Sequence, residues 1–219
     1  MLFNQSVENE IIEFKMRKWM QKFENTSSSN SILPTVFLST LAWFNVTMDG
    51  ESSETRMTID GVLKNVDVKK VDHLLILMKH HCEIAEKPGY REHFTLLHFD
   101  FQDPMWRQYN LLVHNTGTKS LEDAKIMARR VYKELSELYA PMDVDVNQVN
   151  VELYPKICPQ QEPNSLNSGM YVLYFMYWVM NFGYEFQNQE TVMEKVRTEC
   201  VQVVYEILQD ERSCWKKED

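Results

Sequence analysis

One stretch of the sequence joins a polar loop directly to an apolar segment of helical length. It runs CPQQEPNSLNSGMYVLYFMYW from Cys158 to Trp178. The prolines favour a loop in its first half, and the almost unbroken apolar run in its second half predicts a buried helix over 168–182. Such a helix would present Asn167, Ser168 and Gly169 at its positive end. Reactive nucleophiles and the donors that stabilise an oxyanion are often placed in this environment.

The rest of the chain predicts strands and helices in an α+β order. A strand ending at Gln102-Asp103-Pro104 (QDP) and a second strand after it form an antiparallel hairpin. The hydrophobic patterns predict strands over 71–79, 93–101, 105–113 and 149–154. They predict helices over 7–23, 32–46, 120–139 and 190–209. A turn is expected over 115–119, and Ser120 is expected to cap the helix that follows it. We therefore expect a short mixed sheet flanked by helices.

Composition narrows the class of protein. Of the 219 residues 44% are hydrophobic, which supplies a core, and no long Gly/Ser/Pro linker divides the chain, so we expect one domain. The net charge of -9 argues against a nucleic-acid groove. The N-terminus lacks the apolar core of a signal peptide, and no apolar run is long enough to span a membrane.

The cysteines and histidines give no sign of a metal site. The four cysteines are irregularly spaced and form no C-x-x-C pair, which indicates a reducing compartment rather than a disulfide scaffold. The adjacent pair His80-His81 would point to opposite faces of a strand. No cluster of Cys and His has the spacing of zinc ligands, so we expect neither a metal nor a cofactor.

A nucleophile at position 168 would need three partners, and the chain offers one candidate for each. His93 opens the clearest strand and could take a proton, and Asn110 lies near the end of the return strand. The hairpin makes the two neighbours, so that the Asn110 carbonyl could accept the Nδ1–H of His93. Gln161, in the loop before Ser168, could donate to an oxyanion with the backbone N–H of residue 168. Each residue alone has an ordinary structural explanation, but their order and positions together favour a catalytic set.

These residues resemble the ubiquitin-like-protein-specific proteases, the SUMO (sentrin) proteases, whose fold is similar to the adenovirus protease. The loop from Cys158 to Val172 is similar to the C-P-x-Q-x-P-x-S-x-x-C-G-x-Y-V pattern of plant members, and the HFTLLHFDFQDPMWRQYN hairpin to the family's His strand and its return strand. The resemblance implies a papain/adenain-like fold and a cut after the C-terminal Gly-Gly of a ubiquitin-like modifier. It makes His93 the base, Asn110 the orienter, Gln161 the oxyanion donor and Ser168 the nucleophile position.

Three residues depart from the family pattern. Ser168 stands where the family has Cys, which predicts an inactive chain, either an engineered Cys→Ser change or a natural pseudoprotease that still binds a modifier. Phe94 replaces the Trp that usually covers the Gly-Gly tail, which puts SUMO specificity in question. Asn110 replaces the commoner Asp. The resemblance assigns Phe94, Asn167 and Gly169 to the binding of the tail.

The resemblance also bears on domains, partners and location. We expect a catalytic domain over 32–219, with residues 1–31 forming an N-terminal helix and loop. The expected partner is SUMO, a related modifier or its conjugate, with no nucleic acid and no membrane. The expected location is intracellular, in the nucleus or the cytoplasm. A non-catalytic interaction protein on the same fold, and an unrelated α+β domain, are the alternatives.

Overall fold

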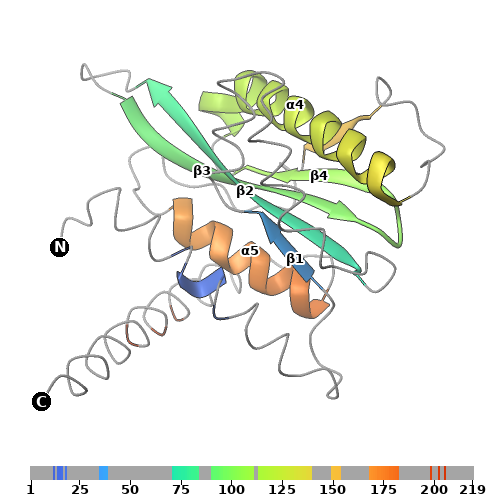
Figure 1. Cartoon of the computed structure of the whole chain (residues 1–219). Helices are drawn as coiled ribbons and strands as arrows, with labels where there is room; N and C mark the ends of the chain where they lie inside the picture. The colour runs from blue at the N-terminus through green and yellow to red at the C-terminus, as the bar shows by residue number, and fades with distance from the viewer. Residues whose placement is uncertain are drawn as a thin grey trace, which may run out of the picture.

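A computed structural model describes a five-stranded sheet with a helix on each face. It describes the backbone of residues 12, 14–16, 18, 35–38, 71–83, 90–110, 113–139, 149–153, 168–182, 198, 202 and 205. The elements are β1 (Thr35–Leu38), β2 (His73–Glu83), β3 (Tyr90–Asp100), β4 (Met105–Tyr109), α4 (Val113–Tyr139), β5 (Val151–Leu153) and α5 (Ser168–Phe182) (Figure 1).

The sheet is mixed, and its strands lie in the order β1-β2-β3-β4-β5. The central strands β2, β3 and β4 are antiparallel to one another, whereas the edge strands β1 and β5 run parallel to their neighbours. The predicted hairpin is present, with a turn over 101–104 between β3 and β4. In this turn the Asp100 carboxylate accepts hydrogen bonds from the backbone N–H groups of Gln102 and Asp103 at 2.9 and 3.2 Å.

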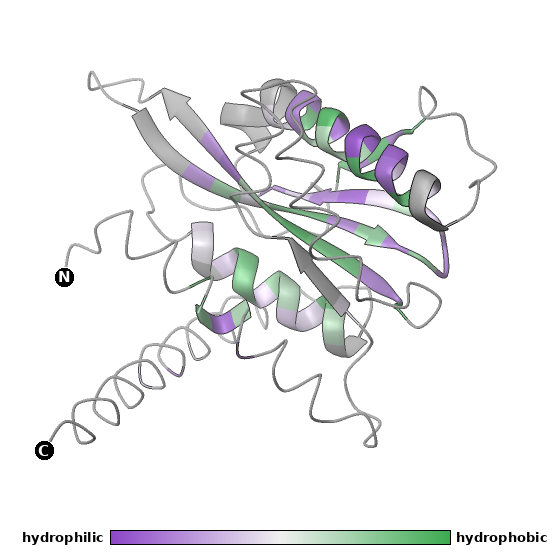
Figure 2. Cartoon of the chain, viewed as in Figure 1, coloured by the Kyte–Doolittle hydropathy of each residue, from purple (hydrophilic) through white to green (hydrophobic). Residues whose placement is uncertain are grey.

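The helix α4 covers one face of the sheet and closes the main core. Alternate residues of a strand point to the same face, and the core cluster combines alternate residues of β2, β3 and β4 with one side of α4. Its fully buried members are Leu74, Ile76, Met78, Leu97, Ala124, Met127, Ala128, Val131 and Leu135. The colouring in Figure 2 shows the amphipathic pattern of α4, with apolar positions alternating with polar ones.

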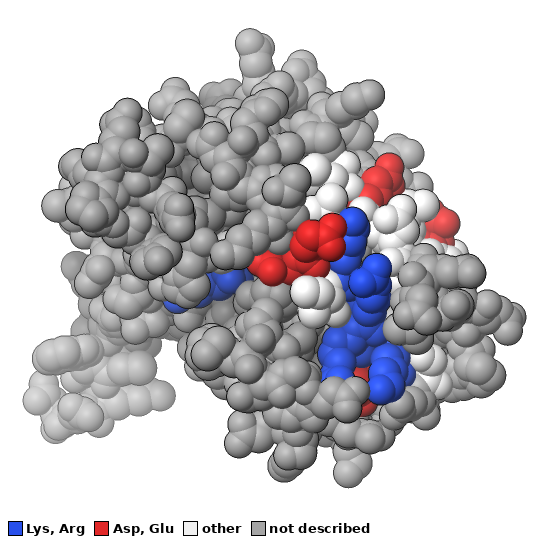
Figure 3. Space-filling view, turned by 90° about the horizontal axis from the view of Figure 1, so that it is seen from above, with Lys and Arg blue, Asp and Glu red and all other residues white. Residues whose placement is uncertain are grey.

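The outer side of α4 is a solvated, mixed-charge surface. Arg129 and Lys133 are exposed, and Lys125 donates to Glu122 one turn earlier at 2.8 Å. Seen from above, basic and acidic side chains lie next to one another on the described part of this face (Figure 3). Exposed pairs of this kind contribute less than about 1 kcal/mol each, so the surface favours solubility more than stability.

The second helix, α5, packs on the opposite face and is apolar almost all round. It contacts β3 and β2. The ring of Phe175 stacks on that of Tyr109 from β4, with 5.5 Å between the ring centroids. Tyr171 to Met176 are all buried, which is what a helix in the interior requires. The predicted helix over 168–182 is therefore confirmed, and it begins at Ser168.

Three predicted elements were wrong. Residues 35–38 lie in strand β1 and not in a helix over 32–46, because Thr35-Val36-Phe37-Leu38 combines β-branched and aromatic residues and can pair with β2. The return strand ends at Tyr109 rather than at Val113. Helix α4 begins at Val113, so the predicted turn over 115–119 is helical and Ser120 lies inside the helix, not at its cap.

The outer parts of the chain are described at only a few positions. Residues 12, 14–16 and 18, and residues 198, 202 and 205, are helical, in agreement with the predicted helices over 7–23 and 190–209. Among the helices that the structure describes, none has both the length and the apolar character needed to cross a bilayer.

Candidate functional site

The hairpin brings His93 and Asn110 together, as its geometry predicts. Strand β4 ends where Tyr109 pairs with Leu96, so Asn110 emerges beside the first half of β3. The Nε2 atom of His93 lies 3.0 Å from Oδ1 of Asn110, and both side chains are buried. The expected contact through Nδ1 was wrong. Because the amide oxygen only accepts, Nε2 is the donor, and in the neutral ring Nδ1 carries the lone pair that could accept a proton.

Helix α4 fixes the orientation of the Asn110 amide. Its Nδ2 donates to Oγ of Ser120 at 2.7 Å, while its Oδ1 faces His93. The two ends of the amide thus have different partners, which determines which end points at the imidazole. Ser120, predicted as a helix cap, is a buried residue inside α4 that holds this amide.

Ser168 lies beside the strand that carries His93. It is the first residue of α5 and is 2% exposed, and its Oγ accepts a hydrogen bond from the backbone N–H of Phe94 at 3.2 Å. That nitrogen is bonded to the carbonyl carbon of His93, so the Ser168 hydroxyl lies within about 4.5 Å of the His93 backbone. We call His93, Asn110 and Ser168 the Ser168 site.

The structure places the remaining predicted residues only in part. Phe94 is fully buried, and by strand alternation it points to the α5 face, whereas His93 points to the α4 face. Gly169 is buried in the first turn of α5. Gln161 and Asn167 lie outside the described residues, so their predicted roles stay predictions.

A second layer of polar side chains lies behind His93 and was not predicted from the sequence. His80 of β2 is the register partner of His93, and their ring centroids are 6.4 Å apart. Its Nδ1 lies 3.1 Å from an Asp123 carboxylate oxygen, and its Nε2 lies 2.8 Å from Thr95 Oγ1. Gln108 donates to the backbone oxygen of Ser120 at 3.0 Å. His93, Thr95 and Gln108 lie on one face of the sheet by strand alternation. This alternation is the feature of the sequence from which the polar layer could have been predicted.

This layer joins the sheet to α4 by polar contacts inside an otherwise apolar core. Buried polar groups are costly unless they are hydrogen-bonded, so the network stabilises the one arrangement of β2, β3, β4 and α4 in which these hydrogen bonds form. It therefore holds the surroundings of His93 and Asn110 rigid. A rigid base is what proton transfer at a fixed atom requires.

Of the comparisons with known proteins, the one with solved structures identifies the fold. No family model and no curated protein matches the chain. Among solved structures, the chain is similar to the SUMO protease Ulp1 with the catalytic cysteine oxidized to a sulfenic acid, with a TM-score of 0.56 and 16% identity over 90% of this chain and 77% of that one. The form oxidized to a sulfonic acid gives 0.55 and 15% over the same shares. The chain therefore has the α+β fold of this cysteine protease, as predicted.

Proposed function

We propose that the Ser168 site is the catalytic centre of a thiol protease in which an oxygen occupies the position of the sulfur. The observation that carries the proposal is the contact of Ser168 Oγ with the backbone N–H that follows His93, at the N-terminus of α5. The Ser168 hydroxyl thus lies beside the backbone of the strand residue whose imidazole the Asn110 amide orients, and the fold is that of a protease with a catalytic cysteine.

With a cysteine at position 168, each residue would have a definite task. Nδ1 of His93 would take the thiol proton, and Asn110 would hold the ring in the required tautomer. The sulfur would attack the carbonyl carbon of the scissile bond, and the resulting oxyanion would accept hydrogen bonds from the N–H of residue 168 and from Gln161. The imidazolium would then return its proton to the leaving amine.

A serine in the same position makes a poor nucleophile. A thiol has a pKa of about 8.5 in solution, and a helix N-terminus and a neighbouring imidazolium lower it far enough for a thiolate to persist. A serine hydroxyl is much less acidic and must lose its proton during the attack. Asn110 is neutral and gives no charge to stabilise the imidazolium while this happens. We expect the chain as written to bind its substrate and to cleave it several orders of magnitude more slowly than the cysteine form.

The substrate proposed for this site is the C-terminal Gly-Gly tail of a ubiquitin-like modifier. The loop from Cys158 to Val172 supports it, because it resembles plant proteases that mature or deconjugate SUMO. Phe94 in place of Trp leaves related modifiers as candidates beside SUMO. Such a substrate and four unpatterned cysteines are consistent with the nucleus or the cytoplasm.

The variant Ser168→Cys tests the proposal directly. We expect it to react with SUMO or ubiquitin carrying a C-terminal vinyl sulfone and to release a C-terminal fluorogenic amide, with a rate at least about 10³-fold above that of the original chain. Ser168→Ala is the matched control, and it should have no rate above background. A folded Ser168→Cys protein that neither reacts with these probes nor releases the amide would overturn the enzyme proposal.

The second candidate is a modifier-binding module without catalysis, which Ser168 itself favours. Under this proposal SUMO or ubiquitin binds the original chain, and shortening the modifier by its two terminal glycines weakens binding at least tenfold, because the tail enters the site. Isothermal titration calorimetry with full-length and shortened modifiers distinguishes the two candidates when it is combined with the Ser168→Cys assay. Binding without any gain of activity would favour the module.

A further inference from the structure

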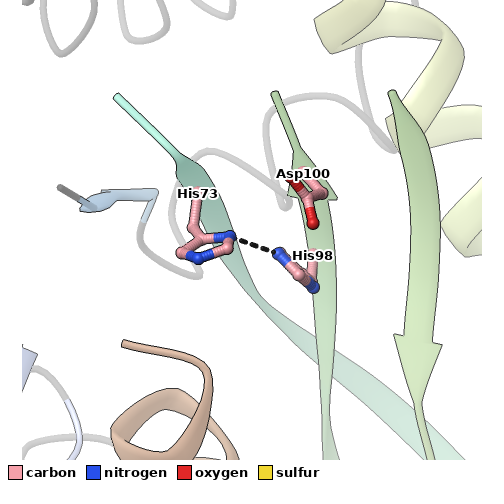
Figure 4. Close-up of side chains that lie close together, drawn as sticks. All are labelled: His73, His98 and Asp100. Carbon is pink, nitrogen blue, oxygen red and sulfur yellow. Dashed lines mark hydrogen bonds between the residues drawn. The ribbon is translucent and has the colours of Figure 1, made fainter. Parts of the chain in front are cut away.

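A second group of histidines lies at the other end of the β2–β3 strand pair. His73 of β2 is the register partner of Asp100 of β3, and His98 lies two residues before Asp100 on the same face. Nδ1 of His73 is 3.0 Å from Nε2 of His98, and one ligand atom from each of the three residues lies within 4.8 Å of the others. Figure 4 shows the two imidazoles facing each other with the Asp100 carboxylate next to them. We call these residues the His98 cluster.

The His98 cluster is buried on the α5 face of the sheet, where polar side chains are costly unless they have partners. His73, His98 and Asp100 are each at most 4% exposed. Nε2 of His73 has no hydrogen-bond partner within the described part of the chain. A buried nitrogen without a partner costs free energy, and a ring bonded at only one nitrogen can reorient towards an ion.

Burial disfavours a positive charge on both imidazoles. Burial lowers the pKa of His73, partly opposed by the nearby carboxylates of Asp100 and Asp72. Burial also lowers the pKa of His98 well below its usual value, and the neighbouring His73 and Arg107 act in the same direction.

The described charged groups around the cluster are mostly acidic. Asp100 lies 3.5 Å from the guanidinium of Arg107, which also binds Asp103 at 3.1 Å. Asp72, next to His73 in the chain, accepts a hydrogen bond from Gln102 at 2.8 Å. Within the described part of the chain, Asp100 and Arg107 are buried and balance one another, while Asp103 and Asp72 add negative charge from the solvent side. This excess of acidic groups favours a cation over an anion.

We propose that His73, His98 and Asp100 form a binding site for a divalent transition metal ion of the zinc class. Two imidazole nitrogens and one carboxylate oxygen are a ligand set that Zn²⁺ takes, with a further position for water. In a tetrahedral site two histidine nitrogens are about 3.3 Å apart. The 3.0 Å between Nδ1 of His73 and Nε2 of His98 thus needs to widen by only a few tenths of an ångström, with the rings turned so that both lone pairs face the ion.

The neighbours of the cluster can orient its ligands. Nδ1 of His98 lies 3.3 Å from the Tyr109 hydroxyl, so that an Nδ1–H donating to this oxygen leaves Nε2 as the ligand atom. The backbone N–H groups of Gln102 and Asp103 hold one oxygen of Asp100, and the other oxygen faces Arg107. Sequence spacing alone could not reveal the site, since His73 and His98 are 25 residues apart and meet only through the β2–β3 register.

Titration of the chelator-treated protein with Zn²⁺ and Co²⁺ tests the proposal. We expect one equivalent of Zn²⁺ to bind by calorimetry. Co²⁺ should give the visible absorption of a four- or five-coordinate nitrogen and oxygen site, without the near-ultraviolet band of a cysteine thiolate. His73→Asn, His98→Gln and Asp100→Asn keep side chains of similar shape, and each should weaken Zn²⁺ binding by about 100-fold or more.

The control is His80→Gln, which removes a buried histidine bonded to a carboxylate on the opposite face of the same strand. It should bind Zn²⁺ as tightly as the original chain. Circular dichroism shows whether each variant is folded. The cobalt spectrum of the unaltered protein decides the question even where a variant does not fold. No stoichiometric binding, a thiolate band, or equal affinity in all folded variants would overturn the proposal and leave the Ser168 site unaffected.

Discussion

His93 of the Ser168 site and the His98 cluster lie toward opposite ends of the β2–β3 pair, and their side chains lie on opposite faces of the sheet. His93 pairs across the sheet with His80, and Asp100 of the cluster pairs with His73. The pairs are seven residues apart along β2, or roughly 23 Å at the usual rise of a strand. An odd separation reverses the face, so His93 lies on the α4 side and the His98 cluster on the α5 side.

The two groups differ in how their hydrogen bonds are directed. In the Ser168 site the amide of Asn110 gives its oxygen to His93 and its nitrogen to Ser120, so every polar atom of the amide has a separate partner. In the His98 cluster two imidazoles share one contact beside a carboxylate. The first arrangement fixes a proton at one atom, as a catalytic base needs. The second offers several ligand atoms to one cation.

The largest difference between the two histidine groups is expected when His93 is removed. In the Ser168→Cys background, His93→Ala should lower the rate of reaction with the vinyl sulfone probe by about 10³-fold, because the base that forms the thiolate is lost. Binding of the modifier should change by less than about threefold, since the tail does not depend on the imidazole. The measurement is the labelling rate with calorimetry in parallel.

A His93→Ala variant that keeps its labelling rate would show that His93 is not the base. The thiol at position 168 would then react without this base, and the difference between the two histidine groups would lose its chemical meaning. Circular dichroism and the modifier affinity separate this result from misfolding.

A smaller effect is expected from the residue that holds the amide. Ser120→Ala in the same background removes the acceptor for Asn110 Nδ2, so the amide can turn and present either end to His93. The lost hydrogen bond, of about 1–1.5 kcal/mol, corresponds to a roughly tenfold lower rate of probe labelling. The pH dependence of the labelling rate should shift as well, because the hydrogen bond from His93 to Asn110 is less well oriented.

Ser136→Ala is the control for Ser120→Ala, since Ser136 lies in the same helix and donates only to carbonyl oxygens one turn earlier. It should leave the rate unchanged. Equal rates in the two variants would mean that Ser120 has only a packing role.

The sequence was sufficient for features that depend on neighbours along the chain. The hairpin at Gln102-Asp103-Pro104 and the apolar run after Ser168 placed β3, β4 and α5, and with them the proximity of His93 and Asn110. It was insufficient where long-range pairing decides. Residues 35–38 became a strand because β2 offered a partner, and His73 met Asp100 only through the register of β2 with β3.

The smallest expected effect concerns the stability of the protein without metal. Because burial lowers the folded-state pKa values of His73 and His98 below 6.5, the unfolded chain binds more protons than the folded one as the pH falls through 6.5. The free energy of unfolding should therefore decrease below that pH, by up to about 1.4 kcal/mol per pH unit for each histidine, and this contribution should be constant above it.

Urea unfolding at pH 7.5, 6.5 and 5.5 in the presence of a chelator measures this dependence, and His98→Gln should reduce the slope between pH 6.5 and 5.5 by about 1 kcal/mol per pH unit. An unchanged slope would mean that His98 is protonated as easily in the folded protein as in the unfolded one. Burial would then not lower the pKa of the His98 imidazole. This measurement thus tests the contrast between the two ends of the strand pair without any ligand.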